Sequence, residues 1–358
     1  MIPPLSSRCF SSKLRPGFAA GRRRRAAVLL LLLLALLSAC DRRSSRTLET
    51  AYVSAPQVSL RDRVAAVYNK VGVVKNGDRV EILERSRNGR FVRVRAPGGG
   101  EGWMEQRYLV SQQVFDGFRA LAAGHAATPV AARSLTRAEL NMHLRPLRDS
   151  ERLYQLAQGD KVDLLERASS PRPSPPQATA AAAPKPGTPG AAVPPPALED
   201  WWLARDAQGH AGWVLGRMLD VDIPLEVAQY AEGQRIVASF VLNEVEDGGK
   251  KVPQYLVLMT EPKDGQPFDY NQARVFTWNP KRGHYETAYR ERRLFGVLPA
   301  RVATERLGKE GMLPVFVLRV QDDDGNLEER KYKLNGVMVR RVTAEGEAAA
   351  PVPARRKR

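Results

Sequence analysis

The stretch VSLRDRVAAVYNKVGVVKNGDRVEILER, residues 58–85, recurs later in the chain as LNMHLRPLRDSERLYQLAQGDKVDLLER, residues 140–167, without a gap. A second block, FVRVRAPGGGEGWM at residues 91–104, aligns in the same way on WWLARDAQGHAGWV at residues 201–214. The segment between the two blocks is 28 residues longer in the second copy. The chain therefore contains an internal duplication, and we expect each copy to fold as one small domain.

Each copy has the sequence pattern of a small β-barrel. A Gly-Asp turn precedes an alternating apolar strand, and Gly99 or Gly209 stands where a tight hairpin requires a positive φ. A Gly-Trp pair then opens the last strand. We predict that Trp103 and Trp213 supply most of the aromatic area that domains of this size bury.

The order of these features resembles the bacterial SH3-like (SH3b) domains, which occur in tandem on secreted and cell-wall-associated proteins. The second copy is the closer match, through Leu140-Asn141-Met142 and Gly212-Trp213-Val214. The first copy departs from the pattern, with Val58-Ser59-Leu60 in place of the usual Leu-Asn. The resemblance implies binding modules or spacers and no catalytic role.

A leucine-rich run precedes the repeats. Arg22–Arg25 lead into the apolar segment 26–39, which has the charge order of a secretory signal and is too short to span a bilayer. The tetrapeptide Leu37-Ser38-Ala39-Cys40 resembles the lipobox of bacterial lipoproteins, which implies cleavage before Cys40 and a lipid on its thiol. The alternative is a plain cleaved signal that leaves Cys40 as a free thiol. We therefore expect an exported protein, held to a membrane by lipid on Cys40 and facing the periplasm or the cell surface.

Charge and cysteine content constrain the partners. The 358 residues carry a formal net charge of +17, and removal of the seven basic side chains of residues 1–39 leaves about +10. An exported basic chain meets anionic lipid, peptidoglycan and acidic envelope polymers rather than nucleic acid. The only other cysteine is Cys9, in the signal segment, so no disulfide is expected.

We predict a mostly β protein with few short helices: two SH3-like barrels, then an antiparallel β-meander forming a small barrel or sandwich. The predicted boundaries are a signal peptide at 1–39, a lipid-anchored tether at 40–51, barrels at 52–111 and 136–222, a helical linker at 112–135, a C-terminal β domain at 223–342 and a disordered basic tail at 343–358. The second barrel contains a Pro/Ala-rich insertion, residues 169–196, which is either a solvated loop or a polyproline ligand.

The C-terminal domain is predicted to contain eight strands, because apolar runs there are separated by turn signals such as Asp247-Gly248 and Asn335-Gly336. The runs cover residues 236–245, 254–260, 274–278, 285–289, 295–303, 314–320, 328–334 and 337–342. A short helix is expected between Pro224 and Gly233. Basic and aromatic side chains gather in this domain, where they are candidates to receive an anionic polymer or peptide.

No catalytic motif stands out. The histidines are scattered singly and lack the paired spacing of a zinc site, and the acidic run 322–324 is placed where a hairpin needs a turn. We expect no cofactor, no metal, no small-molecule substrate and no enzymatic activity. The candidate binding residues are Trp103, Trp202, Trp213, Tyr285 and Arg290.

The function predicted from these features is binding or scaffolding at the cell envelope, with the barrels contacting peptidoglycan or an envelope protein. One alternative is an assembly factor that docks a membrane complex through its C-terminal β domain. Another is an uncharacterised hydrolase with its site in that domain.

Overall fold

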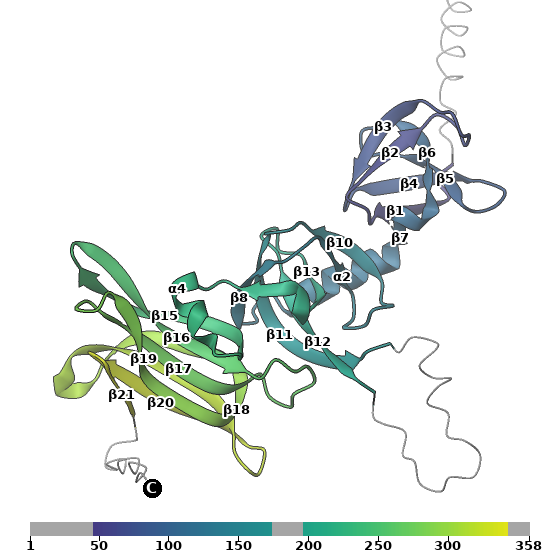
Figure 1. The fold of residues 1–358 in the computed structure, drawn as a ribbon. Helices are drawn as coiled ribbons and strands as arrows, with labels where there is room; N and C mark the ends of the chain where they lie inside the picture. The colour runs from purple at the N-terminus through teal and green to yellow at the C-terminus, as the bar shows by residue number, and fades with distance from the viewer. Residues whose placement is uncertain (1–45, 174–195, 343–358) are drawn as a thin grey trace, which may run out of the picture. The chain divides into compact units, whose positions relative to one another are not determined.

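The computed structural model describes residues 46–173 and 196–342, which form three seven-stranded sheets (Figure 1). The protein is mostly β, with antiparallel sheets and few short helices, as its sequence predicts. Within these residues no helix is long and apolar enough to cross a membrane. The predicted signal segment, the lipidation site Cys40, the basic tail and most of the Pro/Ala-rich insertion lie outside the described residues.

The first sheet is the first barrel, ordered β3-β2-β6-β5-β4-β1-β7. Its strands are β1 (Glu49–Val53), β2 (Gln57–Arg61), β3 (Lys70–Lys75), β4 (Arg79–Arg85), β5 (Phe91–Arg95), β6 (Glu101–Glu105) and β7 (Leu109–Ser111), with a 3-10 turn η1 (Gln106–Tyr108) before the last. Because side chains alternate along a strand, Val92 and Val94 point inward and Phe91 points outward. The core is aliphatic apart from Met104: Ala51, Val53, Leu60, Val74, Val80, Ile82, Val92, Val94 and Met104. Trp103 is not among these residues.

The second sheet repeats the first strand for strand, in the order β10-β9-β13-β12-β11-β8-β14. Its strands are β8 (Ala132–Thr136), β9 (Leu140–His143), β10 (Arg152–Leu156), β11 (Lys161–Pro171), β12 (Leu198–Arg205), β13 (Ala211–Leu215) and β14 (Leu219–Val221), with η2 (Gly216–Met218) where the first copy has η1. Strand β11 continues to Pro171, and its last residues pair with the start of β12. The insertion therefore begins after a lengthened hairpin and not at Ser169.

One helix, α2 (Gln112–Gly124), connects the two barrels. The hydroxyl of Ser111 accepts a hydrogen bond from the Val114 N–H and so caps its first turn. Phe115 stacks on Tyr52 of the first barrel at 3.7 Å between ring centroids, and Phe118 packs edge-on against Tyr154 of the second at 5.5 Å. The linker is thus a three-turn helix that packs against both barrels.

The third sheet is an uninterrupted meander from β15 to β21. Its strands are β15 (Arg235–Asp247), β16 (Lys250–Thr260), β17 (Tyr270–Asn279), β18 (His284–Arg306), β19 (Met312–Gln321), β20 (Leu327–Asn335) and β21 (Met338–Arg341), with η4 (Gly308–Glu310) before β19. The prediction of eight strands is wrong by one, because residues 285–289 and 295–303 belong to the single strand β18. No Gly or Pro turn separates them, and a bulge at Arg293 bends the strand without ending it.

Both faces of this sheet are covered. On the inner face, side chains of successive strands such as Leu258, Val275 and Phe316 pack together. They form one apolar core with side chains of the second barrel. The outer face carries the short helix predicted after Pro224, which consists of α4 (Leu225–Ala228) and η3 (Gln229–Ala231). Val227 of α4 is fully buried there against Tyr255 and its neighbours.

Candidate binding face of the first barrel

The outer surface of β2, β6 and β5 in the first barrel brings aromatic and basic side chains together. Trp103 lies directly opposite Arg61 on β2 and Arg93 on β5, and it is partly exposed. The Cβ atoms of residues directly opposite in an antiparallel pair are about 5 Å apart, so Trp103 has an arginine as its cross-strand neighbour on each side. Arg61 also lies over the ring of Tyr68 at 4.1 Å and near that of Phe91 at 5.6 Å. We call Arg61, Tyr68, Phe91 and Trp103 the aromatic–basic face.

The loop between β2 and β3 extends this face with apolar side chains. Val67 is 85% exposed and Val64 is also exposed, as is Val71 at the start of β3. The loop is held in shape by Asp62, whose carboxylate accepts hydrogen bonds from Arg63 and from both the backbone N–H and the side-chain amide of Asn69. These bonds lower the pKa of Asp62 to about 2, with Arg63 the largest cause. Val64 and Val67 therefore lie on a loop whose two ends are held together by the hydrogen bonds between Asp62 and Asn69.

A row of ion pairs borders the aromatic–basic face. Arg93 pairs with Glu101 at 2.8 Å, and Arg95 pairs with Glu101 and with Glu81 at 2.8 and 3.0 Å. Within the described residues Arg61 makes no ion pair, so its charge is available to a ligand. This distribution favours a ligand with flat or apolar groups and a negative charge.

The equivalent surface of the second barrel is closed. The strand positions of Phe91, Arg93 and Trp103 are occupied there by Trp201, Leu203 and Trp213, all buried. Two groups of side chains from outside the sheet pack on them: Leu121 and Ala122 of α2, and Val130 of the segment that follows. The two barrels therefore differ in which surface is accessible. The linker covers this face in the second barrel, and the same face is open in the first.

Three of the predicted binding residues belong to apolar cores. Trp213 is 9% exposed under the linker, and Trp202 points to the opposite side of β12, into the core shared with the third sheet. Tyr285 packs against Trp278 in the third sheet and donates its hydroxyl to the Pro253 carbonyl at 2.9 Å. Their rings stabilise the fold and have no free face for a ligand.

The other two predicted residues remain accessible. Trp103 lies on the outer face of the first barrel and not in its core, which corrects the expectation that it supplies the buried aromatic area there. Arg290 lies on β18 and pairs with Glu232 at 3.0 Å. Trp103 and Arg290 belong to different sheets, so they do not form one site.

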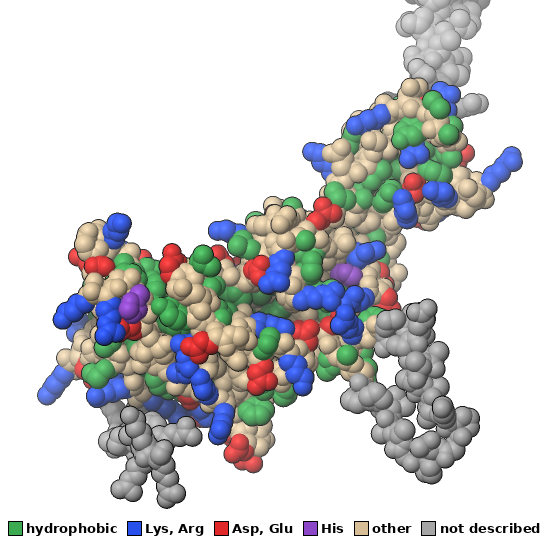
Figure 2. All heavy atoms as spheres, in the orientation of Figure 1, with side chains coloured by type: hydrophobic (Ala, Val, Ile, Leu, Met, Phe, Trp, Pro, Cys, Tyr) green, Lys and Arg blue, Asp and Glu red, His purple; other side chains and the backbone are tan. Residues whose placement is uncertain are grey.

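Sequence reasoning missed Arg61, Tyr68 and Phe91. The signal was present, because the alternation in β5 and β6 places Phe91 and Trp103 on the side opposite to Val92 and Met104. Charge alone gives no signal: Figure 2 shows Lys and Arg side chains spread over the visible surface and mixed with acidic ones.

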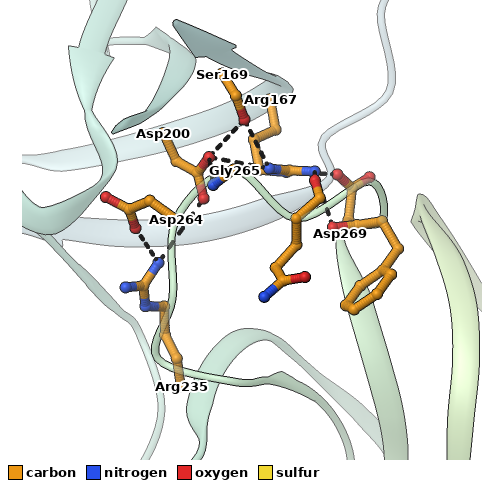
Figure 3. A network of polar contacts seen from close by, with 9 residues as sticks. Arg167, Ser169, Asp200, Arg235, Asp264, Gly265 and Asp269 are labelled. Atoms are coloured by element: carbon orange, nitrogen blue, oxygen red, sulfur yellow. Dashed lines mark hydrogen bonds and ion pairs between the residues drawn. The ribbon is translucent and has the colours of Figure 1, made fainter. Parts of the chain in front are cut away.

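A second polar cluster joins the second barrel to the third sheet (Figure 3). The guanidinium of Arg167, 12% exposed, donates to Asp200 at 3.1 Å, to Asp269 at 2.8 Å and to the carbonyls of Gln266 and Phe268, both at 2.8 Å. Asp200 also accepts from Ser169 and from the backbone N–H of Gly265. We call this the Arg167 network.

The Arg167 network has the properties of an interdomain contact. Arg235 extends it by pairing with Asp264 at 2.8 Å, so each of its acids has a basic partner. The cavity beside it holds only about 50 Å³, room for very few water molecules. Residues 46–173 and 196–342 contain no group of three His, Cys, Asp or Glu side chains that could hold a metal ion.

Comparison with known proteins gives a partial match. No curated protein matches the chain significantly. Among solved structures, an NlpC/P60 family protein from Bacillus cereus is 12% identical over 48% of this chain and 56% of that chain, with a TM-score of 0.22. NlpC2 from Trichomonas vaginalis is 10% identical over 70% of this chain and 98% of that chain, with a TM-score of 0.16. Such scores carry no argument about function. Residues 57–110, which span the first barrel from β2 into β7, match the family model described as the bacterial SH3 domain.

Proposed function

We propose that this chain is a non-enzymatic lipoprotein of the cell envelope whose first barrel binds peptidoglycan or another envelope component. The match of residues 57–110 to the bacterial SH3 domain supports an envelope ligand. We further propose that the second barrel is a second SH3-like domain of the same kind, since it repeats the strand order of the first. In this proposal Cys40 carries the lipid that holds the protein at the membrane.

The observation that carries the proposal is the difference between the two copies. The aromatic–basic face of the first barrel is accessible, whereas the same face of the second is buried under the linker. A planar guanidinium over aromatic rings recognises flat groups and carboxylates together. The peptides that cross-link cell walls offer both kinds of group, because they contain planar peptide bonds and free carboxylates.

The test is co-sedimentation of residues 41–358 with purified cell-wall sacculi at low salt and at about 0.5 M salt, where screening is stronger than in physiological buffer. We expect retention at high salt, and loss of at least about tenfold in affinity for Arg61→Ala combined with Trp103→Ala. The matched control is Phe295→Ala, which removes an aromatic side chain that is 48% exposed in the third sheet.

Two results would contradict this proposal. Release at high salt would mean that the net positive charge alone produced the contact. Equal binding by the double variant and the control would remove the aromatic–basic face from consideration. Lipidation is tested separately, by mass spectrometry of the protein isolated from cells and of its Cys40→Ala variant. An unmodified Cys40 in the unsubstituted protein would overturn the proposed lipid anchor.

A further inference from the structure

The third sheet contains a polar pocket of about 310 Å³ that is far in the chain from the aromatic–basic face. Its wall comes from the residues after η3 and after β16, from the start of β17, and from the bulge in β18. The lining side chains are Glu232, Gln234, Glu261, Asn271, Gln272, Arg292 and Arg293. All are polar, so the pocket is suited to a charged or strongly hydrogen-bonding group.

Two unusual backbone conformations meet at this pocket. Among residues 46–173 and 196–342, the non-glycine residues with a left-handed backbone are Glu232, at φ 54°, and Arg293, at φ 61°, and both line it. Such conformations cost on the order of 1–3 kcal/mol each and gather where a side chain must be held in a particular place. Each occurs where its chain changes direction: Glu232 is the C-cap of η3, and Arg293 lies in the bulge of β18.

The bulge explains how Arg293 reaches the pocket. Tyr270 pairs with Gly296 and Gln272 pairs with Arg292, so the single residue Asn271 faces three residues of β18. A bulge of this kind breaks the strict alternation of side chains and redirects them. Consecutive Arg292 and Arg293, which a regular strand would point to opposite faces, therefore line the same pocket.

The two arginines are free to bind. Arg292 donates its Nε to Gln272 at 3.0 Å, and within the described residues neither Arg292 nor Arg293 makes an ion pair. Gln272 is buried and donates its amide to Met259, which fixes the partner of Arg292. The Arg292 guanidinium is therefore held at its Nε, and its two terminal nitrogens remain available to a ligand.

The acids of the pocket are already engaged. Glu232 accepts from Arg274 at 3.0 Å and from Arg290 at 3.0 and 3.1 Å, and Glu261 accepts from the Asn271 amide at 3.4 Å. Arg274 is itself 3% exposed, and its Nε has no partner within the described residues. Four arginines thus lie near Glu232, which neutralises only part of their charge.

We propose that this pocket binds a small oxyanion, a phosphate or carboxylate group, through Arg292 and Arg293. Arginine presents paired N–H donors that match the oxygens of both groups. Glu232 and Glu261 limit the affinity, because their carboxylates lie in the wall of the pocket and repel an incoming anion. The site is independent of the first barrel and gives the third sheet a ligand of its own.

The test is calorimetric titration of residues 41–358 with inorganic phosphate and, separately, with acetate, at constant ionic strength set with chloride. We expect saturable binding of at least one of the two anions. Arg292→Gln combined with Arg293→Gln should weaken it by about tenfold or more. The control, Lys281→Gln combined with Arg282→Gln, removes the same charge from the Asn279–His284 turn. It should leave the affinity for the anion unchanged.

A second variant tests the role of Glu232. Glu232→Gln keeps the shape of the side chain and removes its charge, so the anion should bind about threefold tighter or more. Thermal melting of each variant without anion separates a folding defect from a binding defect. Non-saturable heats, equal weakening by the control pair or unchanged affinity in the Arg292/Arg293 variant would each overturn the proposal. Preference for phosphate or for acetate identifies which oxyanion the pocket takes.

Discussion

The Nε of Arg167 lies 2.8 Å from the Oδ1 of Asp269, and this bond joins the second barrel to the third sheet. The two residues are 102 positions apart in the chain. In the first barrel the repeat position of Arg167 is Arg85, which pairs with the exposed Glu49 at 2.8 Å. The same residue of the duplicated unit therefore serves an interdomain contact in one copy and a surface ion pair in the other.

Arg167→Met should destabilise the protein strongly. It leaves Asp200 and Asp269, both largely buried, without their shared cation, and breaking a buried pair in this way costs about 3–5 kcal/mol. Arg85→Met is the matched control and should cost less than about 1 kcal/mol, because exposed ion pairs contribute little. Urea unfolding followed by circular dichroism measures both; similar losses would contradict the assignment of Arg167 to a structural contact.

The two Gly-Trp tryptophans should differ in the same assay. Trp213→Ala removes a buried ring from beneath the linker and should cost about 3–5 kcal/mol. Trp103→Ala should cost clearly less, since its ring is partly exposed and the core of its barrel is made of other residues. Equal destabilisation would mean that the Trp103 ring is packed and unavailable to a ligand.

The duplication could be predicted from sequence because turns and alternation are local properties. Gly77-Asp78 and Gly159-Asp160 specify the same turn in both copies, and Gly77 and Gly159 both have positive φ, at 82° and 83°. The same local rules identified α2 and α4, and they failed at β18, where a bulge at Arg293 takes the place of a turn and has no Gly or Pro to mark it.

The use of each face could not be predicted, because it depends on contacts between distant segments. Trp103 and Trp213 occupy the same repeat position, yet only Trp213 is covered by Leu121 and Val130. The decisive difference is in the neighbours: Arg93 and Glu101 of the first copy correspond to Leu203 and Ala211 of the second. A charged pair keeps a sheet face in water, whereas Leu and Ala permit a helix to cover it.

Acid should loosen the loop that carries Tyr68. The pKa of Asp62 is lowered from 3.8 to about 2, so its bonds to Arg63 and Asn69 are fully present above pH 3.8 and are lost as the pH falls through about 2. Asp62→Asn should produce the loosened loop at neutral pH and weaken binding to sacculi. Hydrogen exchange at the Asn69 amide reports the change; exchange that is unaltered in Asp62→Asn would show that the carboxylate does not close the loop.

The glycine of each Gly-Trp pair should be irreplaceable, and more so in the second barrel. A Cβ on Gly212 would lie 2.5 Å from the Cβ of Met142, and one on Gly102 would lie 2.8 Å from the Cβ of Leu60. Both distances are shorter than real Cβ contacts allow, and both neighbours are buried, so neither can move away cheaply. The crossing of β9 over β13, and of β2 over β6, therefore requires a residue without a side chain.

Gly212→Ala and Gly102→Ala should each lower the free energy of unfolding by about 1–3 kcal/mol or more, as overpacked cores do. The larger loss is expected at Gly212. Gly98→Ala is the control, because a Cβ there meets nothing within 4 Å and its φ is not positive. Thermal melting of the three variants gives the comparison. A Gly212→Ala protein as stable as the Gly98→Ala control would show that β9 and β13 can move apart enough to admit a methyl group beside Met142, and it would contradict this prediction.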